Sequence, residues 1–302
     1  MIQNKSANPE MILDGVEDHI PLSNFTTFGI GGPARHLKIV KSVEEMVELH
    51  HMCLKMNIRY FILGKGSNCL FDDRGFDGLV IVNRIDFLEK PTENTWYVGA
   101  GYSFSYLGIQ TARLGWGGLE FASGIPGSVG GAIYMNAGAN GSETANSLIS
   151  VDYLNEEGEI IRLDRSEIVF GNRYSTFQKR RGVILGGVFQ LTPSENARQH
   201  QLDLFHYRKQ TQPFDAKCAG CVFKNPPNGH AGAIIDQLGL KGNQFGEAQI
   251  SPKHANFIVN QGKASSQDVK NLIAFIQNQV KEKTEYELEL EVRLIHYQAS
   301  LE

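Results

Sequence analysis

Two glycine-rich segments carry residue types that suit anion binding through the main chain. The first, GKGSNCLF, spans residues 64–71 and follows an apolar run that predicts a strand. Glycine adopts positive φ angles without strain, so successive backbone N–H groups can converge on an anion, and Ser67 and Asn68 add polar side chains. A tight turn with Asn68 in a left-handed conformation explains the same residues without any ligand.

The second segment, GLEFASGIPGSVGGAIYMNAGANGSE, spans residues 118–143. Nine of the 32 glycines fall within residues 115–141, where bare backbone can approach a ligand closely. No GKS or GKT follows, and the GxGxxG spacing after a strand is missing, so neither a P-loop nor a Rossmann turn fits. A purely structural cluster of glycines is the alternative.

Three further motifs carry side chains that could take part in catalysis. Arg173 lies in FGNRYSTF, and a guanidinium can bind a carboxylate through two parallel hydrogen bonds, although an arginine in a polar turn is usually a solvated surface residue. Cys218 and Cys221 form a lone CxxC pair, which lacks the remaining ligands of a tetrahedral zinc site; redox use and simple packing are the other readings. Glu289 and Glu291 alternate with apolar residues, as on a solvated edge strand.

Composition narrows the function classes. The 302 residues carry a net charge of −4 and a pI near 6.2, without the basic stripe expected of a nucleic-acid-binding protein. No apolar stretch approaches the roughly 20 residues of a membrane span, and the first twenty residues lack the apolar core of a signal peptide. Four cysteines are too few for a disulfide scaffold in so long a chain. We therefore expect a cytoplasmic enzyme or binding protein.

Hydrophobic periodicity predicts mixed α and β domains. Ser42 and Glu45 form a capping-box signature before a helix to about Met56, and a last helix begins near Ser265. The polar stretch PSENARQHQ, residues 193–201, is the best linker candidate. The other predicted elements are strands at 36–40, 60–64, 78–82, 96–101 and 287–295 and a helix at 103–114.

The motifs together resemble one known family. NFTTFGIGGPA (24–34), GIPGSVGGA (124–132), GCVFKNP (220–226) and LELEV (288–292) occur in the order and at the spacing of the UDP-N-acetylenolpyruvoylglucosamine reductases, the MurB family of peptidoglycan precursor synthesis. The chain resembles the shorter of the family's two types.

This resemblance implies an α+β fold with three parts. After an N-terminal extension (1–23), an FAD-binding region of two mixed α/β subdomains would span 24–193, similar to the vanillyl-alcohol-oxidase (PCMH-like) flavoproteins. An α+β substrate-binding domain would follow at 194–302, in agreement with the predicted linker. The residues expected to hold FAD are Gly64, Lys65, Gly66, Ser67, Asn68, Gly124, Ile125, Pro126, Gly127, Ser128, Val129, Gly130 and Gly131.

The resemblance also implies a reaction. NADPH would reduce FAD, and the flavin would then give hydride to an enolpyruvyl ether on UDP-N-acetylglucosamine. Arg173 and Glu291 would stabilise the enolate that forms, and Cys221 would donate the proton at a position where most of the family has Ser. Asn172 and Tyr174 depart from the family's usual Tyr and Asp beside this arginine.

Two further assignments concern substrate binding. Asn225 in FKNP would contact the substrate, and Lys209 would meet the UDP phosphates, although the family's lysine usually stands immediately before the Gln-Pro pair. Two other functions compete with the reductase: a flavin oxidase acting on a sugar or lactone, and a nucleotide-binding protein without catalysis.

Overall fold

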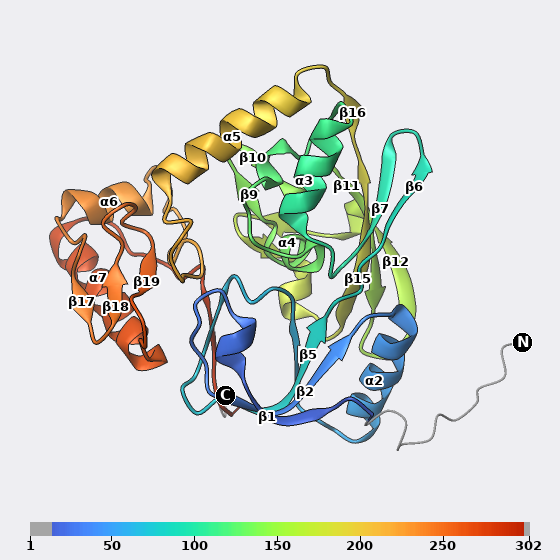
Figure 1. The fold of residues 1–302 in the computed structure, drawn as a ribbon, viewed down its shortest axis with the longest axis horizontal. Coiled ribbons are helices and arrows are strands. Elements are labelled where there is room, and N and C mark those ends of the chain that lie inside the picture. The colour runs from blue at the N-terminus through green and yellow to red at the C-terminus, as the bar shows by residue number, and fades with distance from the viewer. Residues whose placement is uncertain (1–13, 299–302) are drawn as a thin grey trace, which may run out of the picture.

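The first unit of the fold is a four-stranded sheet covered by one helix (Figure 1). The computed structural model describes residues 14–298. The strand order is β1-β2-β5-β3, with β1 antiparallel to β2 and the other neighbours parallel. The elements are β1 (Glu17–Pro21), β2 (Pro33–Val40), α2 (Val43–Lys55), β3 (Tyr60–Leu63) and β5 (Phe76–Asn83).

Helix α2 begins where the sequence predicts it. The Ser42 Oγ accepts a hydrogen bond from the Glu45 N–H at 3.1 Å, while the Glu45 carboxylate accepts from the Lys41 N–H at the same distance. These bonds satisfy backbone donors that the first helical turn leaves without partners. Met46 and Leu49 then bury the apolar face of the helix against the sheet.

The second unit is a five-stranded antiparallel sheet in the order β12-β11-β15-β7-β6. Its strands are β6 (Leu88–Thr92), β7 (Thr95–Gly99), β11 (Leu148–Leu154), β12 (Ile160–Asp164) and β15 (Val183–Gln190). Helix α3 (Phe104–Arg113), predicted at 103–114, and helix α4 (Val129–Met135) share one buried apolar cluster with this sheet. The two mixed units agree with the predicted fold class.

Helix α5 (Ala197–Thr211) replaces part of the predicted linker. It packs beside α3 in Figure 1, and the buried Gln201 donates through Nε2 to the Ser123 Oγ at 2.7 Å. Residues 197–201 therefore form the first turn of a helix. Their polar composition hid this, because α5 has a weak apolar face and buries only a few of its residues.

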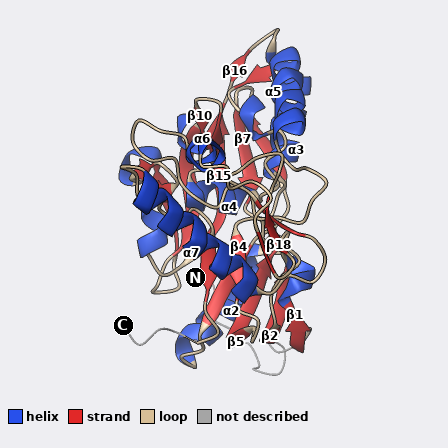
Figure 2. Ribbon diagram, turned by 90° about the vertical axis from the view of Figure 1, so that its left-hand side faces the viewer, coloured by secondary structure: helices blue, strands red, loops and turns tan. Residues whose placement is uncertain are grey.

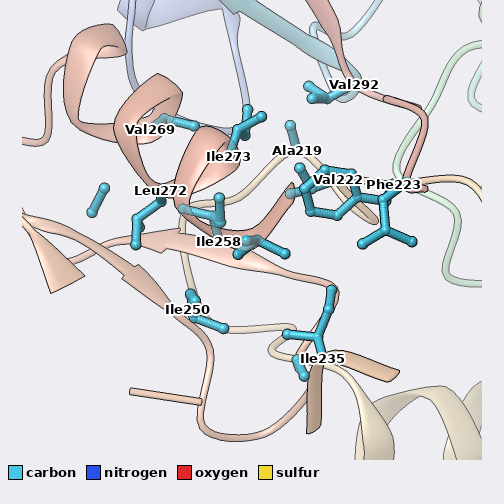
Figure 3. Close-up of a cluster of buried hydrophobic side chains, with 14 of the residues drawn as sticks. Ala219, Val222, Phe223, Ile235, Ile250, Ile258, Val269, Leu272, Ile273 and Val292 are labelled. Carbon is cyan, nitrogen blue, oxygen red and sulfur yellow. The ribbon is translucent and has the colours of Figure 1, made fainter. Parts of the chain in front are cut away.

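The C-terminal unit packs two helices and a small sheet around its own core. Its elements are α6 (Ala231–Gln237), β17 (Gln244–Phe245), β18 (Ala248–Ile250), β19 (Ile258–Asn260) and α7 (Ser266–Lys283). Figure 2 views the molecule from this side, with α7 toward the viewer. Figure 3 shows part of this core, in which α7 packs in one buried cluster with Val222 and Phe223. The α7 side chains labelled there are Val269, Leu272 and Ile273. The predicted last helix is confirmed, and its N-cap Ser265 and Asp268 form a capping box.

The chain finally returns to the first unit. Strand β20 (Arg293–Ile295) pairs in parallel with β4 (Cys69–Phe71), which forms the end of the first glycine segment. The predicted strand at 287–295 is wrong in its first part: residues 287–292 cross between units and make only one isolated bridge, from Leu290 to Phe223. Alternation alone cannot separate such a crossing segment from a strand.

Short elements complete the described chain. The strands are β8 (Trp116–Gly117), β9 (Gly138–Ala139), β10 (Ser142–Glu143), β13 (Phe170–Gly171), β14 (Tyr174–Ser175) and β16 (Thr192–Pro193). The 3₁₀ turns are η1 (Leu22–Phe25), η2 (Glu120–Ala122), η3 (Thr144–Asn146), η4 (Arg165–Glu167) and η5 (Thr176–Lys179). Within residues 14–298, no helix combines the length and apolar character needed to cross a membrane.

The predicted domain boundaries at 23/24 and 193/194 stay predictions. Residues 1–13 of the predicted N-terminal extension lie outside the described residues, whereas β1 in the same stretch is an edge strand of the first sheet. Across the other boundary, the C-terminal core also includes Phe28, Ile30 and Leu70 from the first unit. The units therefore share buried apolar surface.

Candidate active site

A cavity of about 1100 Å³ is lined by all three units. Its wall includes both predicted glycine segments, residues 64–68 and 124–128, and extends along residues 57–63 and 180–184. The predicted catalytic residues that line it are Arg173, Cys221 and Glu291. Side chains that lie far apart in the sequence thus surround one space large enough for a dinucleotide and a substrate.

In the first glycine segment, main chain and neighbouring residues approach closely. A Cβ on Gly64 would lie 2.4 Å from the Ser128 Oγ of the second segment, and a Cβ on Gly66, whose φ is +63°, would lie 2.1 Å from the Phe25 carbonyl oxygen. The clash with backbone and the positive φ make glycine necessary at Gly66, whereas a Cβ on Gly64 would displace the Ser128 hydroxyl. The left-handed residue of this turn is Gly66, while Asn68 has a negative φ.

Three main-chain donors of the first glycine segment are available for a ligand. Among the described residues, no acceptor is found for the backbone N–H groups of Lys65, Gly66 and Ser67. The Lys65 side chain lies at the same wall, where burial and the neighbouring Arg84 lower its pKa. Three free N–H groups and a lysine fit an anionic group such as a diphosphate.

The second segment uses its N–H groups differently. The Gly124 N–H donates to the Ser105 Oγ at 2.8 Å, and the N–H groups of Val129 and Gly130 donate to the carbonyls of Tyr102 and Ala100. Val129 is also fully buried and does not line the cavity. This segment therefore fits a flat, largely apolar ring better than an anion.

Arg173 sits at the tip of a tight hairpin between β13 and β14. Its φ of +55° is unusual for a residue with a side chain, so neighbouring groups must hold the turn. The Gln178 Nε2 donates to the Arg173 carbonyl at 3.0 Å, and the Asn136 Nδ2 donates to the Gly171 carbonyl at 3.0 Å. Because Asn136 caps α4, the second glycine segment and Arg173 belong to one rigid piece.

Arg173 and Glu291 form a hydrogen-bonded ion pair. The Arg173 Nε donates to the Glu291 Oε1 at 2.7 Å, and Nη2 donates to the Gly138 carbonyl at 2.8 Å. Burial raises the pKa of the Glu291 carboxyl, while Arg173 and then Lys224 oppose the rise. Glu289 instead points outward to Lys224, with an exposed fraction of 79% for its side chain.

Cys221 is a free thiol at the same end of the cavity. Burial, and then the nearby Glu291, raise its pKa to about 12, against the opposing effect of Arg173 and Arg208. The thiol therefore carries its proton throughout the physiological pH range. It is a weaker acid than the ordinary thiol pKa near 8.5 suggested.

The segment after Cys221 is held by a buried asparagine. The Asn256 Oδ1 accepts from the Phe223 N–H at 2.9 Å, and its Nδ2 donates to the Phe223 carbonyl at 2.8 Å. The Val222 N–H donates to the Asn256 carbonyl. Both main chain and side chain of Asn256 therefore fix the backbone that carries the thiol.

The two predicted substrate residues differ in position. Asn225 lines the cavity, and its Oδ1 accepts from the Ala231 N–H of α6 at 3.0 Å, which leaves the Nδ2 donor for a ligand. Lys209 is exposed on α5 and does not line the cavity, whereas its neighbour Arg208 does. One helical position turns a side chain by about 100°, so only one of the two can face the site.

Family models match both parts of the chain. Residues 34–164 match the FAD binding domain, and residues 212–295 match the UDP-N-acetylenolpyruvoylglucosamine reductase C-terminal domain. The protein named UDP-N-acetylenolpyruvoylglucosamine reductase from Protochlamydia amoebophila is 57% identical over 293 residues, covering 97% of this chain and 98% of its own length. The chain belongs to the UDP-N-acetylenolpyruvoylglucosamine reductase family.

Other members of this family agree. The reductase from Chlamydia pneumoniae is 44% identical over 300 residues, covering 98% of this chain and 97% of its own length. The crystal structure titled UDP-N-acetylenolpyruvylglucosamine reductase (MurB) from Thermus caldophilus matches with a TM-score of 0.81 and 36% identity, covering 93% of this chain and 98% of that one. The predicted family and fold class are confirmed.

Two arginines that line the cavity were not predicted from the sequence. Arg208 lines the wall and its buried Nε has no hydrogen-bond partner within the described residues, and Arg293 lies over the Tyr134 ring with 4.8 Å between its Cζ and the ring centroid. No local pattern marks Arg208, because charges on a polar helix usually face solvent. Arg293 could have been found from its place two residues after Glu291.

Proposed function

We propose that this protein catalyses the NADPH-dependent reduction of UDP-N-acetylglucosamine enolpyruvate to UDP-N-acetylmuramate, with FAD as cofactor, in peptidoglycan precursor synthesis. The observation that carries the proposal is the convergence of Arg173, Cys221 and Glu291 on a cavity shared with two glycine segments. The reaction would take place in the cytoplasm, where NADPH and UDP-linked sugars are found, and needs neither nucleic acid nor membrane insertion.

The two glycine segments would divide the binding of FAD between them. The free N–H groups of residues 65–67 would bind the diphosphate, and residues 124–128, 130 and 131 would flank the isoalloxazine ring. When bound, FAD supplies the methylene carbon of the enol ether with a hydride that it received from NADPH. The domain division at 24–193 and 194–302 is part of the same proposal.

Arg173 would bind the substrate carboxylate. Its Nε and Nη2 are occupied by Glu291 and Gly138, so the plane of the guanidinium is fixed, and no partner is found for Nη1 among the described residues. As hydride reaches the methylene carbon, negative charge develops on the neighbouring carbon and spreads into the carboxylate. A fixed cation stabilises this charge without reorganisation during the reaction.

Cys221 would donate the proton that completes the product. The carbon that bears the carboxylate and the ether oxygen takes the thiol proton, the S–H bond breaks, and a lactyl ether and a thiolate remain. A thiol with a pKa near 12 stays protonated until it faces a strongly basic carbon, and Arg173 and Arg208 stabilise the thiolate that remains. Glu291 would orient Arg173 through their ion pair, and its negative charge would offset the positive charge of the guanidinium.

Arg208 and Asn225 would hold the nucleotide part of the substrate. Both line the cavity, and the unpartnered Nε of Arg208 is a buried donor that an anionic oxygen can satisfy. Because Lys209 lies outside the cavity, we assign the contact with the UDP phosphates to Arg208 instead.

The test is spectroscopic and kinetic. Purified protein should show flavin absorbance, and NADPH oxidation under nitrogen should match the added enolpyruvyl nucleotide mole for mole. Absence of bound flavin would overturn the proposal. A flavin oxidase would instead consume oxygen with an alcohol substrate, and a binding protein would oxidise no NADPH.

A further inference from the structure

We propose that Asn68 is a positioning residue that ties Glu291 to the first glycine segment, so that the acid keeps its place opposite Arg173. The inference rests on the proposed function and assigns Asn68 a role besides cofactor contact. It links the segment expected to hold FAD with the segment that carries a catalytic carboxylate.

The link consists of two hydrogen bonds between segments far apart in the sequence. The Asn68 Nδ2 donates to the Glu291 carbonyl oxygen at 3.0 Å, across 223 positions. The Asn68 carbonyl in turn accepts from the Arg293 N–H at 3.0 Å. Asn68 therefore forms hydrogen bonds with the main chain on both sides of Val292, at the start of β20.

The backbone around Glu291 depends on these hydrogen bonds because residues 287–292 belong to no strand. Residues 287–292 make one isolated bridge, at Leu290, and their few main-chain bonds to Val222 and Lys224 do not continue into the ladder of a strand. On its other side the Glu291 N–H donates to the Val222 carbonyl at 2.8 Å, next to Cys221. Hydrogen bonds therefore hold the Glu291 backbone on one side to Asn68 of the first glycine segment and on the other side to Val222, next to Cys221.

Loss of the Asn68 amide would act on the Glu291 carboxylate through its backbone. Among the described residues, Asn68 is the only hydrogen-bond donor to the Glu291 carbonyl, so this bond would be lost and the Arg173 Nε contact at 2.7 Å would loosen with it. The enolate step uses this pair, whereas hydride transfer from NADPH does not. The two half-reactions should therefore respond differently.

The experiment compares Asn68→Ala and the nearly isosteric Asn68→Asp with the unchanged protein. In flavin-loaded enzyme under nitrogen, we expect the rate of reoxidation by the enolpyruvyl nucleotide, divided by the rate of flavin reduction by NADPH, to fall roughly five-fold or more, because any lost contact with FAD slows both half-reactions whereas the displaced Glu291 slows only reoxidation. The ratio of the two rates does not depend on the fraction of folded protein. Aspartate has nearly the shape of asparagine but lacks the side-chain N–H donor, so Asn68→Asp should slow reoxidation as Asn68→Ala does.

A second readout uses no catalysis. Hydrogen exchange of the peptide covering residues 288–296 in FAD-free protein should speed up in both variants. The role of Asn68 would be overturned if both half-reactions slowed equally and FAD binding weakened. It would also be overturned if neither the ratio of the two rates nor the hydrogen exchange of residues 288–296 changed. If the unchanged protein fails to transfer hydride to the nucleotide, the proposed function fails instead, and the exchange result still tests the link.

Discussion

The Nε atom of Arg173 lies 2.7 Å from the Oε1 atom of Glu291, although 118 positions separate the two residues. Arg173 stands on a hairpin of the second unit, and Glu291 stands on the segment that returns from the C-terminal unit toward β20. The pair forms only when the chain has folded back on itself. The site is therefore completed by the last segment of the described chain.

The reactivity of Cys221 should follow its raised pKa. Alkylation by iodoacetamide, followed by peptide mapping, should be slow at pH 7 and rise close to ten-fold per pH unit up to at least pH 9.5, because the thiolate fraction grows toward a pKa of about 12. Glu291→Gln removes a negative neighbour and lowers this pKa, so alkylation should be faster at each pH. The alkylated enzyme should keep FAD and lose turnover. A plateau in rate near pH 8.5 would show an ordinary thiol and contradict the prediction.

Arg208 and Lys209 offer a matched pair of substitutions on one helix. Arg208→Gln should weaken UDP binding to the flavin-loaded, oxidised enzyme by roughly ten-fold, because a buried charged donor is lost. Lys209→Gln should leave the dissociation constant within about two-fold, since this side chain lies outside the cavity. Calorimetric titration measures both. The reverse order of effects would return the phosphate contact to Lys209.

Asp73 joins two units of the fold. Its Oδ1 accepts from the Ser266 N–H at 2.7 Å, and its Oδ2 accepts from the Ser266 hydroxyl at 2.8 Å and from the Gln267 N–H at 3.2 Å. A carboxylate at the start of α7 also interacts favourably with the helix dipole. Asp73→Ala should lower the free energy of unfolding by about 1–2 kcal/mol in urea titrations. Asp73→Asn keeps an acceptor and should lose less; equal stability of all three proteins would contradict the capping role.

The sequence predicted the regular elements because their signals are local. Ser42 with Glu45, and Ser265 with Asp268, mark helix starts that the structure reproduces. Residues from both glycine segments line the cavity, with Val129 as an exception, and their predicted role in holding FAD stays a prediction.

Contacts between units could not be predicted in the same way. Nothing in the sequence around Asn68 or Arg208 shows that Asn68 donates to the Glu291 carbonyl or that Arg208 lines the same cavity as Cys221. The predicted strand at 287–295 was too long because residues 287–292 alternate in polarity while crossing between units. Such relationships depend on the tertiary arrangement, which a single sequence does not contain.

The proton transfer assigned to Cys221 is the central claim, and the two half-reactions of its variants test it most directly. Under nitrogen, flavin reduction by NADPH should survive in both Cys221→Ala and Cys221→Ser. Reoxidation by the enolpyruvyl nucleotide should fall by about 10²–10⁴-fold in Cys221→Ala and stay substantial in Cys221→Ser, where a hydroxyl replaces the donor. Unimpaired reoxidation in Cys221→Ala would show that the proton comes from another group and would contradict the account.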